Sequence, residues 1–393
     1  MNEILFDFSL QPISNRFLDA KTNVNSPLYP LKLEINLKSG LIRITEPFPI
    51  NELKPHFKWL TCFEPEDHLD DLVQKLIKLP GINKSSVFAG YSFKDDSTLR
   101  RLETFGFIKN WRIDSVRDLK ISDPLASIET YQCVLTLAKA REISAHRGTA
   151  DVFIVRHVIE HAHDLTTFIN AIKSMVSPGG YIVWELPDCE HALNIGDCTT
   201  LWEEHIFYFT GFTFKQLLVN SGFSIYHFES VYYPLENSLV AIVQQAPVFV
   251  KQLSLEVKQI DNEIARAKRF VQIMLCRKKE IRKKLLTLRK EKGEIAIFGA
   301  GHLSVAFISL MQVEDLISCV VDDNPNKIGM IMPIGQLPIV GSEALYSDKI
   351  KVCLLGLNPL NHEKLLTKHL RFVELGGIFA SIFPGNELDL EPN

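Results

Sequence analysis

Residues 151–186 read DVFIVRHVIEHAHDLTTFINAIKSMVSPGGYIVWEL, and this stretch decides the fold. Apolar residues run together over 152–155, recur with helical spacing over 167–176, and run together again over 181–186 after a Pro-Gly-Gly turn. The pattern predicts a strand, a helix, a turn and a second strand. These are the repeating parts of an open α/β sheet.

Polar side chains collect where the first of these strands should end. The segment 156–164 contains Arg156, His157, Glu160, His161, His163 and Asp164. Open α/β sheets bind their ligands outside the carboxyl ends of the strands. We therefore expect the functional site at this edge.

Composition sets the broad class of the protein. The 393 residues allow two or three domains, and 46% hydrophobic with 23% charged residues is ordinary for a globular protein. A formal charge of −4 gives no footprint for nucleic acid. The sequence has neither a long apolar run nor a signal peptide, and its seven cysteines show no close pairing, so we expect a cytoplasmic protein with reduced thiols and no membrane contact.

The segment 85–92, SSVFAGYS, predicts an earlier parallel strand that leads through a polar turn into a helix. Asp114 ends the next predicted strand about 20 residues later, where an acidic side chain can bind ribose hydroxyls. With Gly90 as its only glycine, the turn is a weak signal on its own. A strand-to-helix turn without a ligand explains it equally well.

A second α/β unit is predicted from residue 294. EIAIFGAGHLS is a strand that runs into a turn with Gly299 and Gly301, and SCVVDDNPNKIG is a strand that ends at Asp322. Together they outline half of a Rossmann fold, although Ser304 replaces the third glycine.

Residues 251–292 predict one long charged helix with apolar residues at heptad spacing. A helix that braces two domains explains this pattern, and we prefer it to a coiled-coil dimer.

The motifs HVIEHAHDL, SPGGYIVWELPD and EEHIFYF resemble the S-adenosylmethionine-dependent C-methyltransferases of nucleotide-sugar biosynthesis, which put methyl branches on keto-deoxysugars. The resemblance covers nearly the whole chain, from DFSLQPISNRF to FGAG and VVDDNPNKIG. It implies an α/β fold with a small β-rich N-terminal lobe (1–63), a class I methyltransferase domain (64–246), a bracing helix (247–292) and a Rossmann-like C-terminal domain (293–393). It also implies S-adenosylmethionine as cofactor and a nucleotide sugar as substrate, in a monomer or homodimer.

The resemblance assigns roles to particular residues. His205 is the expected base that removes the proton next to the ketone, with Glu204 orienting it, and His161 is expected to hydrogen-bond the enolate or a sugar hydroxyl. Expected cofactor-binding residues are Gly90, Ser92, Asp95, Asp114 and His157, and expected substrate-binding residues are Trp59, Trp202, Gly299, Gly301, His302 and Asp322. Alternatively, His157 and His161 lie four apart on one helical face and only cap the strand.

Several positions depart from the family. Asn36 and Ser39 stand where its N-terminal lobe has zinc-binding cysteines, so we expect no metal. Asp95-Asp96 replaces the family's Asp-Gly, and Trp59 and Trp202 replace tyrosines.

Two other interpretations stay open. Cys189, His191, Cys198 and His205 could form a zinc site, although their spacing matches no common finger. The chain could also be a divergent relative with a changed reaction, or a catalytically silent protein that binds a sugar nucleotide.

Overall fold

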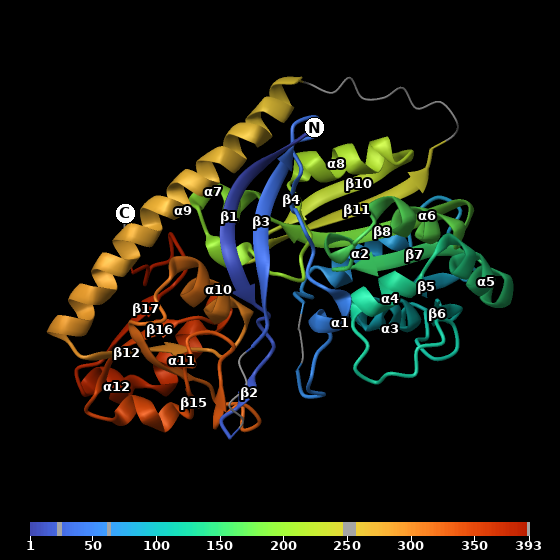
Figure 1. Ribbon diagram of the computed structural model, residues 1–393. Coiled ribbons are helices and arrows are strands. Elements are labelled where there is room, and N and C mark those ends of the chain that lie inside the picture. Colours follow the sequence, from blue (N-terminus) through green and yellow to red (C-terminus); the bar gives the residue numbers. More distant parts are fainter. Residues whose placement is uncertain (22–25, 61–63, 247–256, 391–393) are drawn as a thin grey trace.

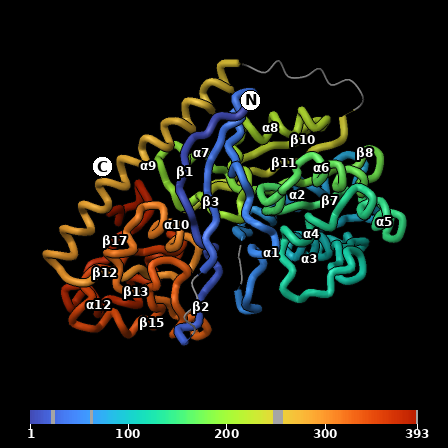
Figure 2. Tube along the Cα trace, viewed as in Figure 1, coloured from blue at the N-terminus to red at the C-terminus, as the bar shows by residue number. Residues whose placement is uncertain are grey.

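The computed structural model describes residues 1–21, 26–60, 64–246 and 257–390. Strands of these residues form a four-stranded, a six-stranded and a five-stranded sheet, together with a two-stranded ribbon. The N-terminal strands lie between the C-terminal sheet and the middle of the chain, and one long helix runs past them (Figure 1). Figure 2 shows the same order along the trace, from blue through green to red.

The N-terminal sheet is antiparallel, with the order β1-β3-β4-β9. Its strands are β1 (Asn2–Pro12), β3 (Leu28–Asn36), β4 (Ile42–Ile44) and β9 (Phe207–Tyr208), and helix α1 (Ile50–Leu53) follows β4. Alternating residues such as Leu33, Ile35 and Ile44 are fully buried, as the alternation in the sequence predicts. The fourth strand comes from the middle of the chain, and the sequence did not predict it.

The six-stranded sheet has the order β10-β11-β8-β7-β5-β6. Four strands are parallel: β5 (Phe88–Gly90), β6 (Asn110–Arg112), β7 (Ala150–Arg156) and β8 (Val176–Asp188). The strands β10 (Phe223–Val231) and β11 (Asn237–Gln245) form an antiparallel edge next to β8. This confirms the predicted parallel strands.

Helices cover both faces of this sheet because β7 and its neighbours are apolar on both sides. Val152 and Ile154 face one core with residues of α2 (Leu69–Leu76) and α3 (Asp96–Thr104). Phe153 and Val155 face the other core with residues of α4 (Ile128–Val134), α5 (Leu137–Arg147), α6 (Leu165–Ser174) and α8 (Gly211–Asn220). A continuous apolar run therefore becomes a fully buried central strand.

The predicted turn at Pro178-Gly179-Gly180 was wrong. These residues lie inside the long strand β8, and Gly179 has a left-handed φ of 78°. The register shifts between the pairs Ala150–Val176 and Val152–Tyr181, so the extra residues form an irregularity of the strand.

Helix α9 (Val257–Glu291) has 35 residues and runs along the N-terminal and C-terminal sheets (Figure 1). Its apolar stripe is buried within the chain, including Ala267, Phe270, Met274 and Leu285. The stripe thus packs as a brace. The predicted start of this helix at 251, and the first residues of the bracing segment predicted for 247–292, lie outside the described residues. Among the described helices, none has the length and apolar character that crossing a bilayer requires.

The C-terminal sheet is parallel, with the order β15-β13-β12-β16-β17. Its strands are β12 (Glu294–Phe298), β13 (Ile317–Val321), β15 (Ile339–Val340), β16 (Ile350–Leu355) and β17 (Ile378–Ser381), and its helices are α10 (His302–Met311), α11 (His362–Lys368) and α12 (Leu370–Glu374). Strand β14 (Met330–Ile331) pairs with β2 (Leu18–Asp19), which ties the N-terminal region to this unit.

Candidate functional site

A cleft of about 560 Å³ lies where the carboxyl ends of the middle and C-terminal sheets meet. His157 and Glu160 reach it from the end of β7, and His302 reaches it from the start of α10, after β12. Trp202 and His205 line it from the segment before β9. Two strand edges that favour ligands therefore share one cavity.

A buried ion pair lies next to this cleft, at the ends of β7 and β8. Arg156 ends β7 and Glu185 lies opposite it on β8; both are fully buried and bonded to each other. His157 follows with a left-handed φ of 49°, and its Nε2 lies 3.0 Å from Oε1 of Glu185. Burial acts to lower the pKa of His157, but the charges of Glu64 and Glu185 outweigh burial and raise it.

The prediction that His157 and His161 share a helical face was wrong. The short 3₁₀ helix of this segment spans Ile159–His161, and the left-handed residue His157 precedes it. The two imidazoles therefore point to different carboxylates.

His161 is held by a carboxylate that the sequence did not single out. Its Nδ1 lies 2.7 Å from Oε1 of Glu129, at the start of α4, and both side chains are buried. Burial acts to raise the pKa of Glu129, yet the hydrogen bond and charge of His161 leave this pKa lowered. The imidazole consequently has one fixed orientation.

His205 stands among aromatic rings in the cleft. Its ring centroid lies 4.8 Å from that of His161 and 4.9 Å from that of Trp202, which stacks on His302 at 4.4 Å. Burial, with the nearby His161 and Lys94, holds the pKa of His205 well below its usual value. Its ring is therefore neutral at neutral pH and has a lone pair.

Strand β9 explains why His205 lies here. β9 pairs with β4 of the N-terminal sheet, and the amide of Ile206 donates to the carbonyl of Glu160. The segment is thus fixed to both sheets.

Glu204 lies differently from the prediction. Its carboxylate is near Asn15 Nδ2, at 3.5 Å, and forms a group with Glu129 and His161. Burial and the charge of Glu129 raise its pKa well above the usual value. Adjacent residues in an irregular segment project in different directions, so Glu204 supports the His161 side of the site.

In the predicted cofactor loop, the side chain of Asp95 hydrogen-bonds to backbone amides of the same loop and to that of Arg156. Oδ2 of Asp95 accepts from the amides of Tyr91 and Ser92 at 2.7 and 2.8 Å, and Oδ1 accepts from the amide of Arg156 at 3.0 Å. A Cβ on Gly90 would lie 2.8 Å from Cβ of Asp95, so the glycine makes room for this carboxylate. All three of Gly90, Ser92 and Asp95 are buried and Asp95 bonds within the protein, so their assignment to cofactor contacts stays a prediction.

The predicted substrate residues divide into two groups. Trp202 and His302 line the cleft. Trp59 instead packs against Phe57 and Phe17, at ring centroid distances of 4.9 and 6.0 Å, and is not among the residues that line the cleft.

The remaining predicted substrate residues shape the C-terminal sheet. Oδ2 of Asp322 accepts from the amide of Ala300 at 2.9 Å. Gly299, with φ 107°, passes 2.9 Å from the carbonyl oxygen of Gly356, measured from an added Cβ. Neither residue lines the cleft, whereas Gly301 is the N-cap of α10 beside His302.

The proposed zinc set does not come together. Among the described residues, the groups with metal-ligand geometry are Glu160, His161 and His205, and Glu129, His161 and Glu204. Cys189, His191 and Cys198 belong to neither group. Asn36 and Ser39 close the turn between β3 and β4, where the amide of Ser39 donates to the carbonyl of Asn36 at 3.2 Å.

Sequence reasoning missed several residues of the cleft. Glu64, Glu236 and Asn358 line it from loops outside every quoted motif. Burial raises the pKa of Glu236 to about 7, against a hydrogen bond from Thr200. The cleft residues that the sequence did single out lie in or directly beside the HVIEH, EEHIFYF and FGAG motifs, whereas loop residues outside motifs have no periodicity to reveal them.

Two family models match the chain. The model described as C-methyltransferase C-terminal domain matches residues 243–384. The model described as methyltransferase domain matches residues 90–227, which include β5, β7 and β8. The chain belongs to the S-adenosylmethionine-dependent C-methyltransferases. It is an enzyme, and its cofactor is S-adenosylmethionine.

Solved structures resemble part of the chain. One is the Burkholderia thailandensis 1,6-didemethyltoxoflavin-N1-methyltransferase with bound S-adenosylhomocysteine, at 11% identity over 46% of this chain and 78% of that chain, with a TM-score of 0.31. Another is a methyltransferase from Aquifex aeolicus, at 12% identity over 46% and 94%, with a TM-score of 0.29. No curated protein matched the chain.

Two polar groups at the carboxyl edge fit the cofactor of the C-methyltransferase. Asp114 lies just beyond β6, is partly exposed, and has a pKa lowered by the amides of Arg117 and Val116. On α4, Nε2 of Gln132 donates to the carbonyl of Val158 at 2.6 Å, while its buried Oε1 has no hydrogen-bond partner. A buried acceptor without a partner costs stability, which a ligand donor would recover. Asp114 and Gln132 would therefore hold the cofactor, and Gln132 was not foreseen.

Proposed function

We propose that this C-methyltransferase methylates the carbon next to the ketone of a keto-deoxysugar nucleotide, with His205 as the base. The observation that carries the proposal is the position of His205, in a cleft shared by the methyltransferase sheet and the C-terminal sheet. A base must reach the α-proton of a bound substrate before its pKa matters.

The cleft supports a substrate of this size and kind. Its volume of about 560 Å³ lies in the range of small-molecule sites. Trp202, stacked on His302, gives an apolar wall for a sugar ring, and Asn358 and Asn361 add amide groups that hydrogen-bond hydroxyls. The first turn of α10 begins beside His302, and free amides at a helix start favour a diphosphate.

The proposed chemistry divides between the cofactor and the chain. The cofactor supplies the methyl group. His205 accepts the α-proton on its neutral ring, and the charge of Glu64 favours the imidazolium that forms. His161, which Glu129 holds in one orientation beside His205, would hydrogen-bond the enolate oxygen or a sugar hydroxyl. The surrounding buried side chains limit access of water.

Deuterium exchange tests the assignment of the base. We expect the wild type in heavy water to exchange the proton next to the ketone of a keto-sugar nucleotide. His205→Ala should lose exchange and methyl transfer by about a hundredfold or more, while binding of both ligands remains measurable by calorimetry. His163→Ala is the matched control, because His163 is exposed.

Two outcomes would contradict the proposal. Unchanged exchange in His205→Ala would assign the base role elsewhere, with His161 as the next candidate. A wild type that exchanges no keto-sugar nucleotide would contradict the substrate class.

A further inference from the structure

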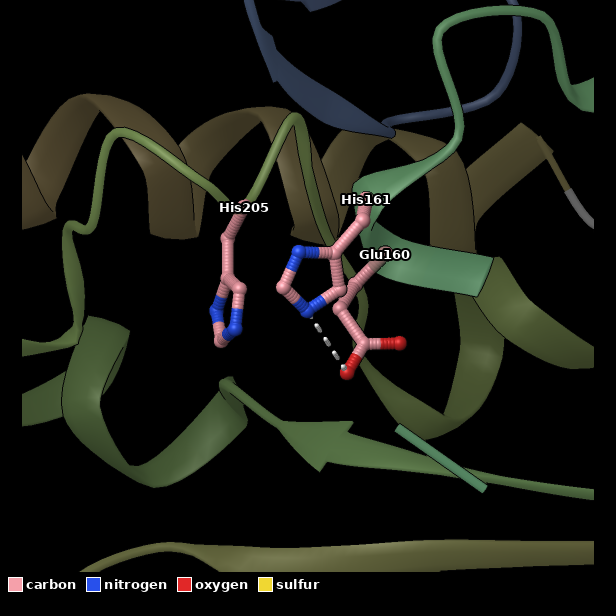
Figure 3. A group of neighbouring side chains, drawn as sticks. All are labelled: Glu160, His161 and His205. Carbon is pink, nitrogen blue, oxygen red and sulfur yellow. Dashed lines mark ion pairs between the residues drawn. The ribbon is translucent and has the colours of Figure 1, made fainter. Parts of the chain in front are cut away.

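Three metal-ligating side chains converge beside the cleft, and two of them, Glu160 and His205, line it. Glu160, His161 and His205 each offer one ligand atom, and these atoms lie within 4.8 Å of one another. Figure 3 shows the two imidazoles side by side and the carboxylate turned toward them. The three residues come from the end of β7 and from the segment before β9, which the N-terminal sheet fixes in place.

Three of the potential metal-ligand atoms in this group lack hydrogen-bond partners. Both oxygens of Glu160 and Nε2 of His161 are buried without one, and the two residues are only 1% and 2% exposed. Buried polar atoms are normally satisfied, and each exception needs an explanation. The separation of His161 Nε2 from Glu160 Oε1 is 3.9 Å, too long for a hydrogen bond. A cation between them would satisfy both atoms.

Glu129 prepares His161 for this role. Nδ1 of His161 lies 2.7 Å from Oε1 of Glu129, so in a neutral imidazole Nδ1 donates to this carboxylate and Nε2 is the nitrogen left to bind a metal. Metal-binding histidines usually have such a carboxylate on their other nitrogen, and losing it costs about 10–100-fold in metal affinity. The neighbouring group of Glu129, His161 and Glu204 is less suitable, because there Glu129 already bonds to His161.

The ligand types indicate the kind of metal. Two imidazoles and one carboxylate suit borderline divalent cations such as Zn²⁺ and Co²⁺. Three protein ligands leave a fourth coordination position open, and two of the three ligands, Glu160 and His205, line the cleft. Tetrahedral bonds of about 2.0 Å place ligand atoms roughly 3.3 Å apart, so small rotations of the side chains would close the site.

We propose that Glu160, His161 and His205 bind one Zn²⁺-like divalent cation, and that this cation inhibits methyl transfer by occupying the lone pair of His205. The binding site does not depend on the proposed substrate. The inhibition does rest on His205 acting as the base. The proposal differs from the expectation of no metal that the sequence gave.

Metal titration without cofactor or substrate tests the site. We expect protein freed of metal by a chelator to bind one Co²⁺ per chain, with visible absorption bands of a four-coordinate site, and one Zn²⁺ to displace it. Glu160→Gln, which keeps the shape of the side chain, and His161→Gln should each weaken binding by about tenfold or more, and Glu129→Gln by a similar factor. His163→Ala should bind like the wild type.

Each result of the metal titrations either supports or overturns the proposed site. Absence of stoichiometric Co²⁺ and Zn²⁺ binding by the folded wild type would overturn the site. So would a metal affinity of Glu160→Gln and His161→Gln equal to that of the wild type. Folding of each variant is checked by circular dichroism. The stoichiometry of metal binding to the wild type tests the site even if a variant fails to fold. Activity separates the two proposals: a Zn²⁺ requirement for methyl transfer would keep the site but refute inhibition and His205 as the base.

Discussion

Glu185→Gln should strongly destabilise the protein, because it removes the partner of a buried arginine. Arg156 and Glu185 are 1% and 0% exposed. Glu185 accepts from Nε and, at 3.1 Å, from Nη2 of Arg156, and its Oε1 also lies 3.0 Å from Nε2 of His157. In the variant, an amide NH₂ would face these donors. Breaking a buried ion pair on one side costs about 3–5 kcal/mol.

The chain offers a matched exposed pair as control. Arg282 donates to both oxygens of Asp315 at 2.8 and 2.7 Å, but the two side chains are 41% and 54% exposed. Asp315→Asn should therefore cost less than about 1 kcal/mol.

Urea unfolding at neutral pH, followed by circular dichroism and tryptophan fluorescence, measures both variants. The double variant Arg156→Met with Glu185→Met should be more stable than Glu185→Gln, since it does not leave the guanidinium of Arg156 buried without its carboxylate. If Glu185→Gln costs no more than Asp315→Asn, the buried pair does not stabilise the sheet edge in the way argued.

Three further changes test the structure. Burial raises the pKa of Glu236 from 4.5 to about 7, so its ionisation costs folding stability as pH rises between these values. Glu236→Gln should match the wild type near pH 4.5 and exceed it by at most about 3 kcal/mol above pH 7; a pH-independent difference in thermal unfolding would contradict this. Gly90→Ala should cost about 1–3 kcal/mol in urea unfolding, because its Cβ would lie 2.8 Å from Cβ of Asp95, and a neutral effect would refute the close packing. Gly196 and Gly179 both have a left-handed φ, 71° and 78°, but an added Cβ at Gly196 would lie 2.5 Å from Cγ2 of Ile273 on α9, whereas the space at Gly179 is open. Gly196→Ala should therefore lower the melting temperature more than Gly179→Ala. Equal melting temperatures would show that α9 shifts to make room.

The sequence could predict the sheets because their signal is local. The run at 152–155 is apolar at every position, and both faces of β7 are buried, so periodicity alone indicated a central strand. The prediction of a turn at 178–180 was wrong because it, too, used only a local signal. Pro178 and the glycines are local turn signals, yet the residues on either side of them, Val176 and Tyr181, both pair with β7, so the chain stays within β8. Tertiary pairing overrides such preferences.

The candidate site was predicted only where its residues lie in motifs. His161 and His205 were singled out from HVIEH and EEHIFYF, and the structure brings their rings to 4.8 Å. Their surroundings were not predictable. Glu129 lies 32 positions before His161, in a helix whose sequence carries no functional signal. Asp95 looked like a ligand-binding residue, but its carboxylate bonds to amides of its own loop and to Arg156.

The sequence by itself determined the α/β class, the central strands, the long helix and the methyltransferase resemblance, because these depend on apolar periodicity and short motifs. Only the tertiary structure decided that β9 joins the N-terminal sheet, that Glu204 points to Glu129 and His161, and that Glu160 meets two imidazoles. These features depend on contacts between residues far apart in the chain. Side-chain direction and burial set those contacts, and neither can be read from spacing along the sequence.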